Sequence, residues 1–281
     1  MEGSVINQIC ASMDSFFDTE KKIGDYIVRN PKQVVDMTVG ELAKECGVSE
    51  ASVSRFCKRI ELKGFHHLKI SLARELVDAK DEGEISGHIS VDDIDGSLRG
   101  ILSNKMEELR QTVAMIDRGE LKKILEVINN ADTVLMAAVG NTIPVAMDGS
   151  YKLNQIGIRA VSTPIWETEL GYSYNMTGKD VVIAISNSGE STGVIQILEA
   201  AKSRGAVTIS ITNSDKSSVA EMSTYHITTA TREKLFLDGY CFSRVSATMV
   251  VEMIYLLLAS MRKESYESIV RHEQAMAYTK E

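Results

Sequence analysis

The chain has 281 residues, of which 44% are hydrophobic and 25% charged, and its formal net charge is −8. This length suits one large domain or two smaller ones, and two is the expectation. No apolar run approaches the roughly 18 to 20 residues of a membrane helix, and the N-terminus lacks a signal-peptide pattern, so we expect a cytoplasmic protein with no membrane partner. The acidic balance argues against a wholly electrostatic nucleic-acid binder, but it allows a small basic module.

Cysteine spacing disfavours a metal site. The four cysteines are scattered along the chain without a Cys-x2-Cys pair: Cys10, Cys46, Cys57 and Cys241. Reduced, partly buried thiols are the expected state of such residues in a cytoplasmic protein. We therefore predict no bound metal and no cofactor.

The N-terminal region is expected to be helical. Apolar residues at helical spacing predict a helix over 5–17, with an inward face formed by Ile6, Ile9, Met13, Phe16 and Phe17. A second helix is predicted over 18–29, with Ile23, Tyr26 and Ile27 on its inward face. It ends there because Pro31 disfavours a helical residue before it.

Two short helices follow, joined by a glycine turn. Thr38 and Glu41 form a capping box, in which hydroxyl and carboxylate satisfy free N–H groups at the start of the first helix. Gly47 supplies the turn, and Ser49 caps a second helix predicted over 50–60. These proportions predict a helix-turn-helix.

The second of these helices begins a basic segment. Between residues 52 and 74 the only acid is Glu61, whereas the cations are Arg55, Lys58, Arg59, Lys63, Lys69 and Arg74. A local surplus of positive charge attracts the phosphate backbone of DNA. A solvated charged helix face is the simpler alternative. The glycine turn, the capping box and the acidic background together favour DNA binding.

Residues 1–77 resemble the N-terminal helix-turn-helix domain of the RpiR/MurR family of bacterial transcription regulators. The resemblance rests on residues 42–60 (LAKECGVSEASVSRFCKRI) and 63–69 (KGFHHLK), while Ile60-Glu61 stands where many members have Leu-Gly. It implies that residues 50–60 form the recognition helix, which enters the major groove. We predict that Ser52, Ser54 and Arg55 lie near the base edges and that Lys58, Arg59 and Lys69 contact phosphates, and Ser49 is also predicted to bind DNA.

After an acidic, glycine-rich linker predicted over 78–97, residues 98–281 alternate between helical and strand patterns. Strands are predicted at 132–138, 158–162, 180–185, 206–212 and 225–229, and helices at 98–116, 121–128, 143–156, 165–176, 194–201 and 245–261. This alternation predicts an α/β domain, a three-layer sandwich with a parallel sheet of about five strands. Ligands of such domains bind at the carboxyl ends of the strands.

The loop after the third predicted strand is rich in hydroxyls and contains Ser186, Ser188, Gly189 and Ser191. It leads into a helix, whose first N–H groups and dipole suit an anion. The loop has no lysine and does not match a P-loop, so a small monophosphate fits better than a nucleoside triphosphate. Serine and glycine are also ordinary turn and cap residues, so this loop alone does not separate a cap from a phosphate site.

Residues 131–230 resemble a SIS (sugar isomerase) domain, which binds phosphosugars. The family signature Ser-x-Ser-Gly-Glu-Thr corresponds to residues 186–191, with Ser191 in place of threonine. The family's first loop, Gly-x-Gly-x-Ser, corresponds to residues 138–142, with Ala138 and Thr142 as the departures. The resemblance implies that Asn141 and Thr142 join Ser186, Ser188, Gly189 and Ser191 in binding a sugar phosphate. It also implies dimerisation.

Catalysis is not expected. Isomerisation of a sugar needs a carboxylate or histidine base with a tuned pKa, and the candidates are Glu167, Glu169, Glu190, His226 and Glu233. Their spacing does not demand such a role, and Glu190 belongs to the binding loop of regulators and enzymes alike.

The sequence thus predicts a transcription regulator whose operator binding is controlled by a sugar phosphate. A homodimer or homotetramer on double-stranded DNA with a palindromic operator is the expected assembly. The main alternative is a sugar-phosphate isomerase or lyase whose N-terminal helices mediate assembly, and an RNA- or protein-binding adaptor is a weaker one. The sequence indicates neither the sugar, nor the operator, nor the sign of control.

Overall fold

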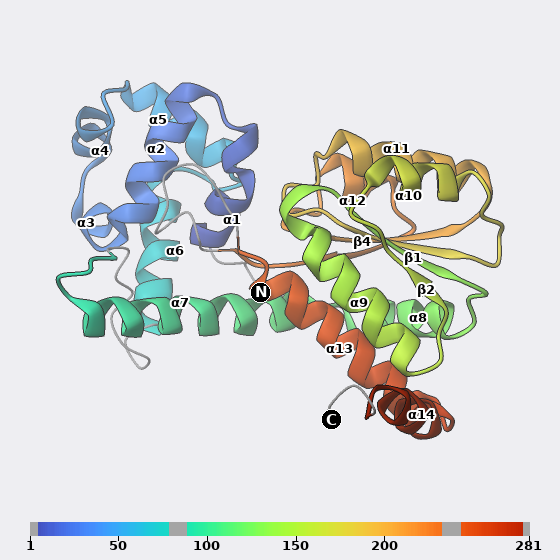
Figure 1. The fold of residues 1–281 in the computed structure, drawn as a ribbon. Coiled ribbons are helices and arrows are strands. Elements are labelled where there is room, and N and C mark those ends of the chain that lie inside the picture. Colours follow the sequence, from blue (N-terminus) through green and yellow to red (C-terminus); the bar gives the residue numbers. More distant parts are fainter. Residues whose placement is uncertain (1–4, 79–88, 232–242, 278–281) are drawn as a thin grey trace. The chain divides into compact units, whose positions relative to one another are not determined.

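The computed structural model describes residues 5–78, 89–231 and 243–277, drawn in Figure 1. The chain divides into two compact units: residues 1–110 with 230–243, and residues 111–229 with 244–281. Part of the predicted linker, residues 79–88, lies outside the described residues. The last residues of the predicted linker, 94–97, are helical, because helix α7 (Ile94–Met115) begins four residues earlier than predicted.

Short helices build the first unit, as predicted. They are α1 (Val5–Ser12), the 3-10 helix η1 (Met13–Ser15), α2 (Asp18–Arg29), α3 (Pro31–Asp36), α4 (Val39–Glu45), α5 (Glu50–Arg59) and α6 (Phe65–Asp78). Their apolar faces meet in one core, where the ring of Phe16 lies edge-on to Phe56 with centroids 5.3 Å apart. Burial of these faces is what stabilises such short helices.

Two details differ from the sequence prediction. The first helix does not reach residue 17, because it tightens into η1 and ends at Ser15. Phe17 is 75% exposed rather than buried, and its N–H donates to the Glu20 carboxylate at 3.0 Å, which fixes the start of α2. Pro31 not only ends α2 but also begins the unpredicted α3, since proline is well tolerated at a first helical position.

The predicted helix-turn-helix is present. The Thr38 N–H donates to the Glu41 carboxylate at 2.7 Å, and the Glu41 N–H donates to the Thr38 hydroxyl at 3.2 Å, so the capping box closes. Gly47 has a φ of +63°, which glycine adopts without steric cost. The Ser49 hydroxyl then accepts from the Ser52 N–H at 3.2 Å and caps α5.

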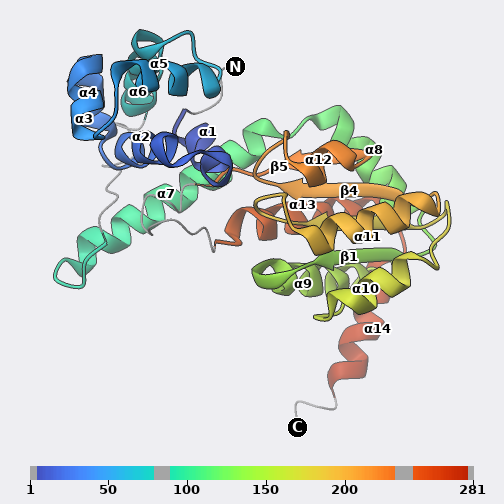
Figure 2. The same ribbon diagram turned by 90° about the horizontal axis from the view of Figure 1, so that it is seen from above.

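The second unit contains a parallel five-stranded sheet (Figure 2). Its strands are β1 (Val134–Ala138), β2 (Ala160–Val161), β3 (Val181–Ile185), β4 (Val207–Thr212) and β5 (Tyr225–Thr228). Its helices are α8 (Arg118–Asn129), η3 (Gly140–Thr142), α9 (Ile143–Gln155), α10 (Trp166–Ser173), α11 (Thr192–Ser203), α12 (Ser218–Met222), α13 (Val245–Met261) and α14 (Ser265–Ala277). The sequence did not predict α14.

Helices cover both faces of the sheet, with α10, α11 and α12 above it and α8, α9 and α13 below it in Figure 1. Alternate residues of β1 enter the two cores: Val134, Met136 and Ala138 on one face, Leu135 and Ala137 on the other. The predicted three-layer sandwich is therefore confirmed.

The strand order creates a topological switch point in this unit. The order is β2-β1-β3-β4-β5, so the chain moves outward in one direction after β1 and in the other after β3. Connections after β1 and β3 thus diverge to opposite faces, and their loops flank a site at the carboxyl ends of these two strands. These are the two loops in which the sequence predicts phosphosugar contacts.

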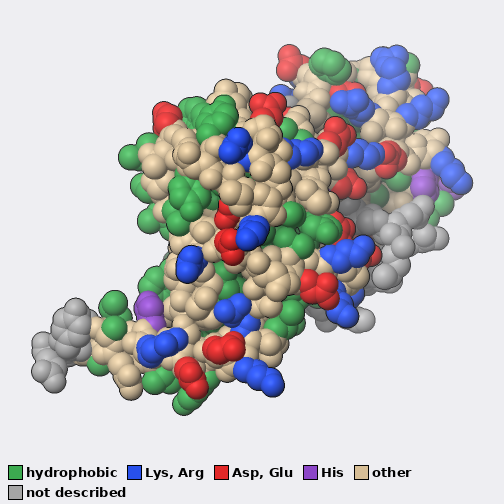
Figure 3. Space-filling model, turned by 90° about the vertical axis from the view of Figure 1, so that its right-hand side faces the viewer, with side chains coloured by type: hydrophobic (Ala, Val, Ile, Leu, Met, Phe, Trp, Pro, Cys, Tyr) green, Lys and Arg blue, Asp and Glu red, His purple; other side chains and the backbone are tan. Residues whose placement is uncertain are grey.

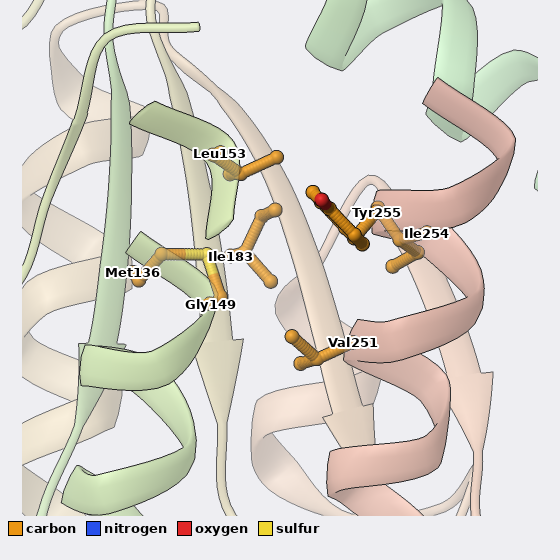
Figure 4. Close-up of a pocket in the computed structure, with 7 residues that line it drawn as sticks. All are labelled: Met136, Gly149, Leu153, Ile183, Val251, Ile254 and Tyr255. Atoms are coloured by element: carbon orange, nitrogen blue, oxygen red, sulfur yellow. The ribbon is translucent and has the colours of Figure 1, made fainter. Parts of the chain in front are cut away.

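A small cavity of about 10 Å³ lies inside the second unit, between the sheet, α9 and α13 (Figure 4). It is lined only by apolar side chains and a glycine: Met136, Gly149, Leu153, Ile183, Val251, Ile254 and Tyr255. A methyl group on Gly149 would lie 2.4 Å from Met136 Cε, so this glycine allows α9 to approach the sheet. Without polar groups the cavity is a packing feature and not a phosphate site.

None of the described helices is by itself long and apolar enough to cross a membrane; α13 and α14 meet the length and composition requirement only as a pair, bent by 114°. On the face shown in Figure 3, hydrophobic side chains occur among charges of both signs.

Candidate functional site

Helix α5 separates its apolar and polar residues onto two faces. Val53, Phe56 and Cys57 are fully buried in the helical core. The opposite face carries the exposed side chains predicted to contact DNA, namely Ser54, Arg55, Lys58 and Arg59, while Ser52 is half-buried beside them. A rigid helix thus presents hydroxyls and cations to solvent, as groove binding requires.

Three of the predicted residues form a hydrogen-bonded chain at the start of α5. The hydroxyls of Ser49 and Ser52 are 2.9 Å apart, and Arg55 Nη2 donates to the Ser52 hydroxyl at 3.1 Å. The cap of the helix therefore orients the guanidinium of Arg55 along the first turn. The sequence predicted a cap at Ser49 and base contacts for Ser52 and Arg55, but it did not predict this connection between them.

Lys69 has a different environment. Its Nζ donates to the Met37 carbonyl at 2.9 Å and lies 5.9 Å from the centre of the Phe65 ring. Lys69 thus joins α6 to the C-terminal end of α3 and is half-buried. Its part in DNA binding remains a prediction.

The described cysteines have no reactive environment. Burial raises the pKa of Cys46 and of Cys57 to about 11, so both thiols stay protonated at neutral pH. Cys10 is buried as well, and Cys241 lies outside the described residues. In the ranges that the structure describes, no three His, Cys, Asp or Glu residues gather to hold a metal ion.

The loop after β3 is a tight turn that requires glycine. Gly189 has a φ of +70°, and a Cβ there would lie 2.1 Å from the Ser217 hydroxyl oxygen. Its N–H donates to the buried Ser186 hydroxyl at 3.2 Å, and its carbonyl accepts from the Val219 N–H at 2.9 Å. The loop is thereby fastened to the start of α12.

The other two predicted serines of this loop are more accessible than Ser186, since Ser188 is exposed and Ser191 is half-buried. Ser188 is exposed and accepts from the Glu190 N–H at 3.3 Å. Ser191 stands at the N-cap of α11, yet its side chain makes no capping hydrogen bond. The Ser191 hydroxyl therefore does not cap the helix. Its residue stands next to the first N–H groups of α11, which have no partner within the helix.

Glu190 crosses from the same loop to α12. Its carboxylate accepts from the Ser218 N–H at 3.0 Å and from the Ser218 hydroxyl at 2.6 Å. An acid in a phosphate loop would repel the ligand, and these contacts hold it at the end of another helix.

The loop after β1 is tied to β3. Thr142 is 3% exposed, and its hydroxyl lies 2.9 Å from the Ile185 carbonyl and 3.2 Å from the Val139 carbonyl. The hydroxyl therefore connects the two loops. Asn141 is half-buried, and its carbonyl accepts from Arg244 Nη1 at 3.3 Å.

Helix α10 packs against the loop after β1 and the start of α11. A Cβ at Gly193, in the first turn of α11, would lie 3.1 Å from Val139 Cγ2 and 3.2 Å from Trp166 Cε3. The first loop, α10 and the start of α11 are thus in van der Waals contact. The two loops that carry the predicted contacts therefore lie against each other.

Glu169, on α10, is fully buried. Its carboxylate accepts from the Ala138 N–H at 3.3 Å and the Thr163 N–H at 3.1 Å, groups that the short strand β2 leaves unpaired. Burial raises its pKa to about 7, although these hydrogen bonds and one from Ser162 favour the charged form. The residue holds the edge of the sheet together at the site.

Sequence reasoning missed Arg244 and gave Trp166 no role. Arg244 is the residue before α13 and lies 103 positions from Asn141, so no local pattern joins them. His226, one of the candidate bases, is hydrogen-bonded to the hydroxyls of Ser210 and Thr228 within the sheet.

The fold and these two sites define a class of protein, in which a helix-turn-helix unit is joined to a doubly wound α/β unit with a ligand site at its switch point. Family models agree, since the helix-turn-helix domain of the rpiR family matches residues 3–79 and the SIS domain matches residues 127–257. The chain belongs to the RpiR family of helix-turn-helix transcriptional regulators with a SIS domain.

Relatives extend over nearly the whole chain. An uncharacterized HTH-type transcriptional regulator of Caldanaerobacter subterraneus is 32% identical over 92% of this chain and 90% of its own. Another from Haemophilus influenzae is 30% identical over 91% and 90%. Among solved structures, Vibrio vulnificus NanR complexed with ManNAc-6P is 25% identical and covers 98% of both chains with a TM-score of 0.60. The sugar isomerase domain of an RpiR transcription factor from Sphaerobacter thermophilus, 24% identical, has the same fold, with a TM-score of 0.57 over 62% of this chain and 96% of that one.

Proposed function

We propose that this regulator binds a sugar phosphate between the loops after β1 and β3 and that the ligand controls its affinity for DNA. The observation that carries the proposal is the meeting of the two loops, through Thr142 and through the contact of Val139 and Trp166 with Gly193. The NanR relative, complexed with ManNAc-6P, supports the choice of a phosphorylated sugar. A ligand shifts the DNA-binding equilibrium only through different affinities for the two states.

Within this site we assign contact and positioning roles. Ser188, Ser191 and the first N–H groups of α11 bind the phosphoryl group, and Asn141 contacts phosphate or sugar hydroxyls. Thr142, Ser186 and Gly189 are buried, so their role is to hold the loops in shape.

On DNA, we propose that Ser54 and Arg55 contact base edges in the major groove while Ser49 and Ser52 hold the guanidinium in place. Lys58 and Arg59 contact phosphates. Lys69 contributes less to phosphate binding, because its ammonium already serves the Met37 carbonyl.

The regulator acts as a homodimer or homotetramer on a palindromic operator, in the cytoplasm where bacterial DNA lies. Support comes from apolar side chains left exposed on the neighbouring helices α9 and α13: Met147, Tyr151, Leu256, Leu257 and Met261. A closed twofold assembly matches two half-sites.

The ligand is not turned over. Two of the candidate carboxylate bases already accept hydrogen bonds from the protein itself. Glu169 accepts from backbone N–H groups, and Glu190 accepts from the N–H and hydroxyl of Ser218. Relatives along the whole chain are named regulators, which supports this choice over the isomerase or lyase alternative.

Fluorescence of Trp166 tests the proposal, because it is the single tryptophan and touches the start of α11. Purified protein is titrated with hexose phosphates and with their unphosphorylated parents, and each mixture is then analysed for product. One phosphosugar is expected to change the emission saturably, whereas its parent does not and no product forms. Turnover of a hexose phosphate would favour the enzyme, and no response to any phosphosugar would contradict the site.

A further inference from the structure

Two consecutive residues, Ser243 and Arg244, stand where the chain passes from the first compact unit to the second. Arg244 Nη1 donates to the Asn141 carbonyl, in the loop after β1, at 3.3 Å. The Ser243 hydroxyl accepts from Lys105 Nζ, on α7, at 2.9 Å. One peptide bond therefore joins a contact of the ligand loop to a contact of α7.

The ligand loops lack positive charge. Residues 139–142 and 186–191 contain no lysine or arginine and include the acid Glu190. Hydroxyls, backbone N–H groups and the dipole of α11 can bind a phosphoryl group, but none of them carries a full positive charge. The Arg244 guanidinium is exposed beside the first of these loops.

Arg244 has donors to spare for a phosphoryl group. A guanidinium carries five N–H donors in a planar fork, and the contact with the Asn141 carbonyl uses one of them, at 3.3 Å, on a neutral acceptor. Phosphate is a stronger acceptor and takes two parallel hydrogen bonds from arginine. An arriving phosphoryl group would thus compete well with the Asn141 carbonyl.

On the other side of the peptide bond, the half-buried Ser243 contacts a half-buried lysine that is paired with a buried carboxylate. Lys105 Nζ lies 2.9 Å from both the Ser243 hydroxyl and the Glu108 carboxylate, and the Glu108 side chain is 1% exposed. A buried carboxylate depends strongly on its cation. Displacement of Ser243 therefore changes the surroundings of an ion pair on α7, the helix that runs from Ile94 in the first unit to Met115 in the second.

We propose that Arg244 supplies the positive charge of the phosphosugar site and that Ser243 passes its movement to Lys105 and Glu108 on α7. The proposal rests on the proposed function, since it names the cation and the first step of regulation for that same site. It assigns two separable roles, ligand affinity to Arg244 and coupling to Ser243.

The role of Arg244 is tested with Arg244→Gln, Arg244→Lys and, as matched control, Arg204→Gln, which removes an exposed arginine at the other end of α11. Trp166 emission is titrated with inorganic phosphate, glucose 6-phosphate and N-acetylmannosamine 6-phosphate. Arg244→Gln should weaken phosphosugar binding about tenfold or more, as loss of a charge-assisted pair predicts, with partial rescue by lysine and no effect of the control. Equal affinity of Arg244→Gln and wild type overturns the assignment. If wild type binds none of the three phosphates, the proposed function fails first.

The role of Ser243 is tested with Ser243→Ala and the control Ser260→Ala, an exposed serine of α13. A DNA fragment is first selected from genomic DNA by its binding to the wild-type protein. Fluorescence anisotropy then measures the affinity of each variant for this fragment, with and without saturating phosphosugar. Ser243→Ala should bind the phosphosugar within about twofold of wild type yet lose most of the factor by which ligand changes DNA affinity, a factor of about 5 to 150 in allosteric proteins. An unchanged factor in Ser243→Ala overturns the coupling role.

Discussion

The two functional regions of this chain are built in opposite ways. On α5, the side chains assigned to DNA project from a helix whose other face is buried, so Ser54, Arg55 and Lys58 are exposed. At the sheet edge, Thr142 and Ser186 are buried and hydrogen-bonded to the chain itself. We therefore expect that substitutions at the DNA-contacting residues leave the fold intact, whereas substitutions at buried residues of the phosphosugar loops alter the fold and the site together.

The largest effect is expected from Gly189→Ala. A methyl group would lie 2.1 Å from the Ser217 hydroxyl oxygen, at a φ of +70° that alanine disfavours. We expect a loss of about 2 kcal/mol or more in the free energy of unfolding, together with loss of phosphosugar binding. Urea denaturation and Trp166 titration measure the two effects.

Gly171→Ala is the matched control for that variant, because a Cβ at this helical position meets nothing within 4 Å. It should fold and bind phosphosugar as wild type does. If Gly189→Ala behaved like this control, the loop would not be the rigid turn on which the contrast with α5 depends.

Arg55→Ala should leave stability unchanged and reduce discrimination between the operator and random DNA. Loss of one bidentate base contact costs about 1 to 3 kcal/mol of discrimination, roughly 10-fold or more. Anisotropy with an operator fragment and a scrambled fragment gives the ratio. A preserved ratio would remove Arg55 from the base contacts.

Lys58→Ala should weaken binding to both fragments and lower the slope of log affinity against log salt by about 1, because one phosphate contact is lost. Lys179→Ala, the same change at an exposed residue of the α/β unit, is the control. A selective effect on the operator alone would contradict the phosphate role.

Glu169 predicts a pH dependence confined to the α/β unit. Its pKa is about 7 in the fold against an ordinary value of 4.5, so folding takes up a proton between these values. Stability therefore falls as pH rises from about 5 to 7, since the folded state binds more protons than the unfolded one. Urea denaturation from pH 5 to 8 should show a flatter slope for Glu169→Gln than for wild type, and equal slopes would exclude Glu169 as the source.

The smallest effect concerns the turn after α5. Glu61 is, among the described residues, the one non-glycine residue with positive φ, at +62°, and it stands where the family often has glycine. Glu61→Gly should be more stable than Glu61→Ala by about 1 kcal/mol, because alanine keeps the backbone strain and glycine relieves it. Comparison of the two variants removes any contribution of the glutamate side chain. Equal stability would mean that the turn carries no strain.

The sequence predicted those features of the fold that depend on interactions between residues close together in the chain. The capping box of Thr38 and Glu41 and the turn at Gly47 follow from neighbours within four residues, and the alternation of strands and helices gave the sandwich. Phe17 was assigned to the core wrongly, because apolar spacing does not reveal that the Glu20 carboxylate starts a new helix there.

The parts of the site that were not predictable depend on contacts distant in sequence. Arg244 reaches Asn141 across 103 positions, and Glu169 finds the Ala138 N–H only because β2 is two residues long. Spacing along the chain carries no information on either contact, since both arise from the topology of the sheet.

Selection of genomic DNA fragments by the purified regulator, with and without hexose phosphates and their parent sugars, tests the central claim most directly. We expect retention of a few palindromic fragments, with retention changed by one phosphosugar and not by its parent. Absence of any specific retention at low and moderate salt, with or without these ligands, would contradict it.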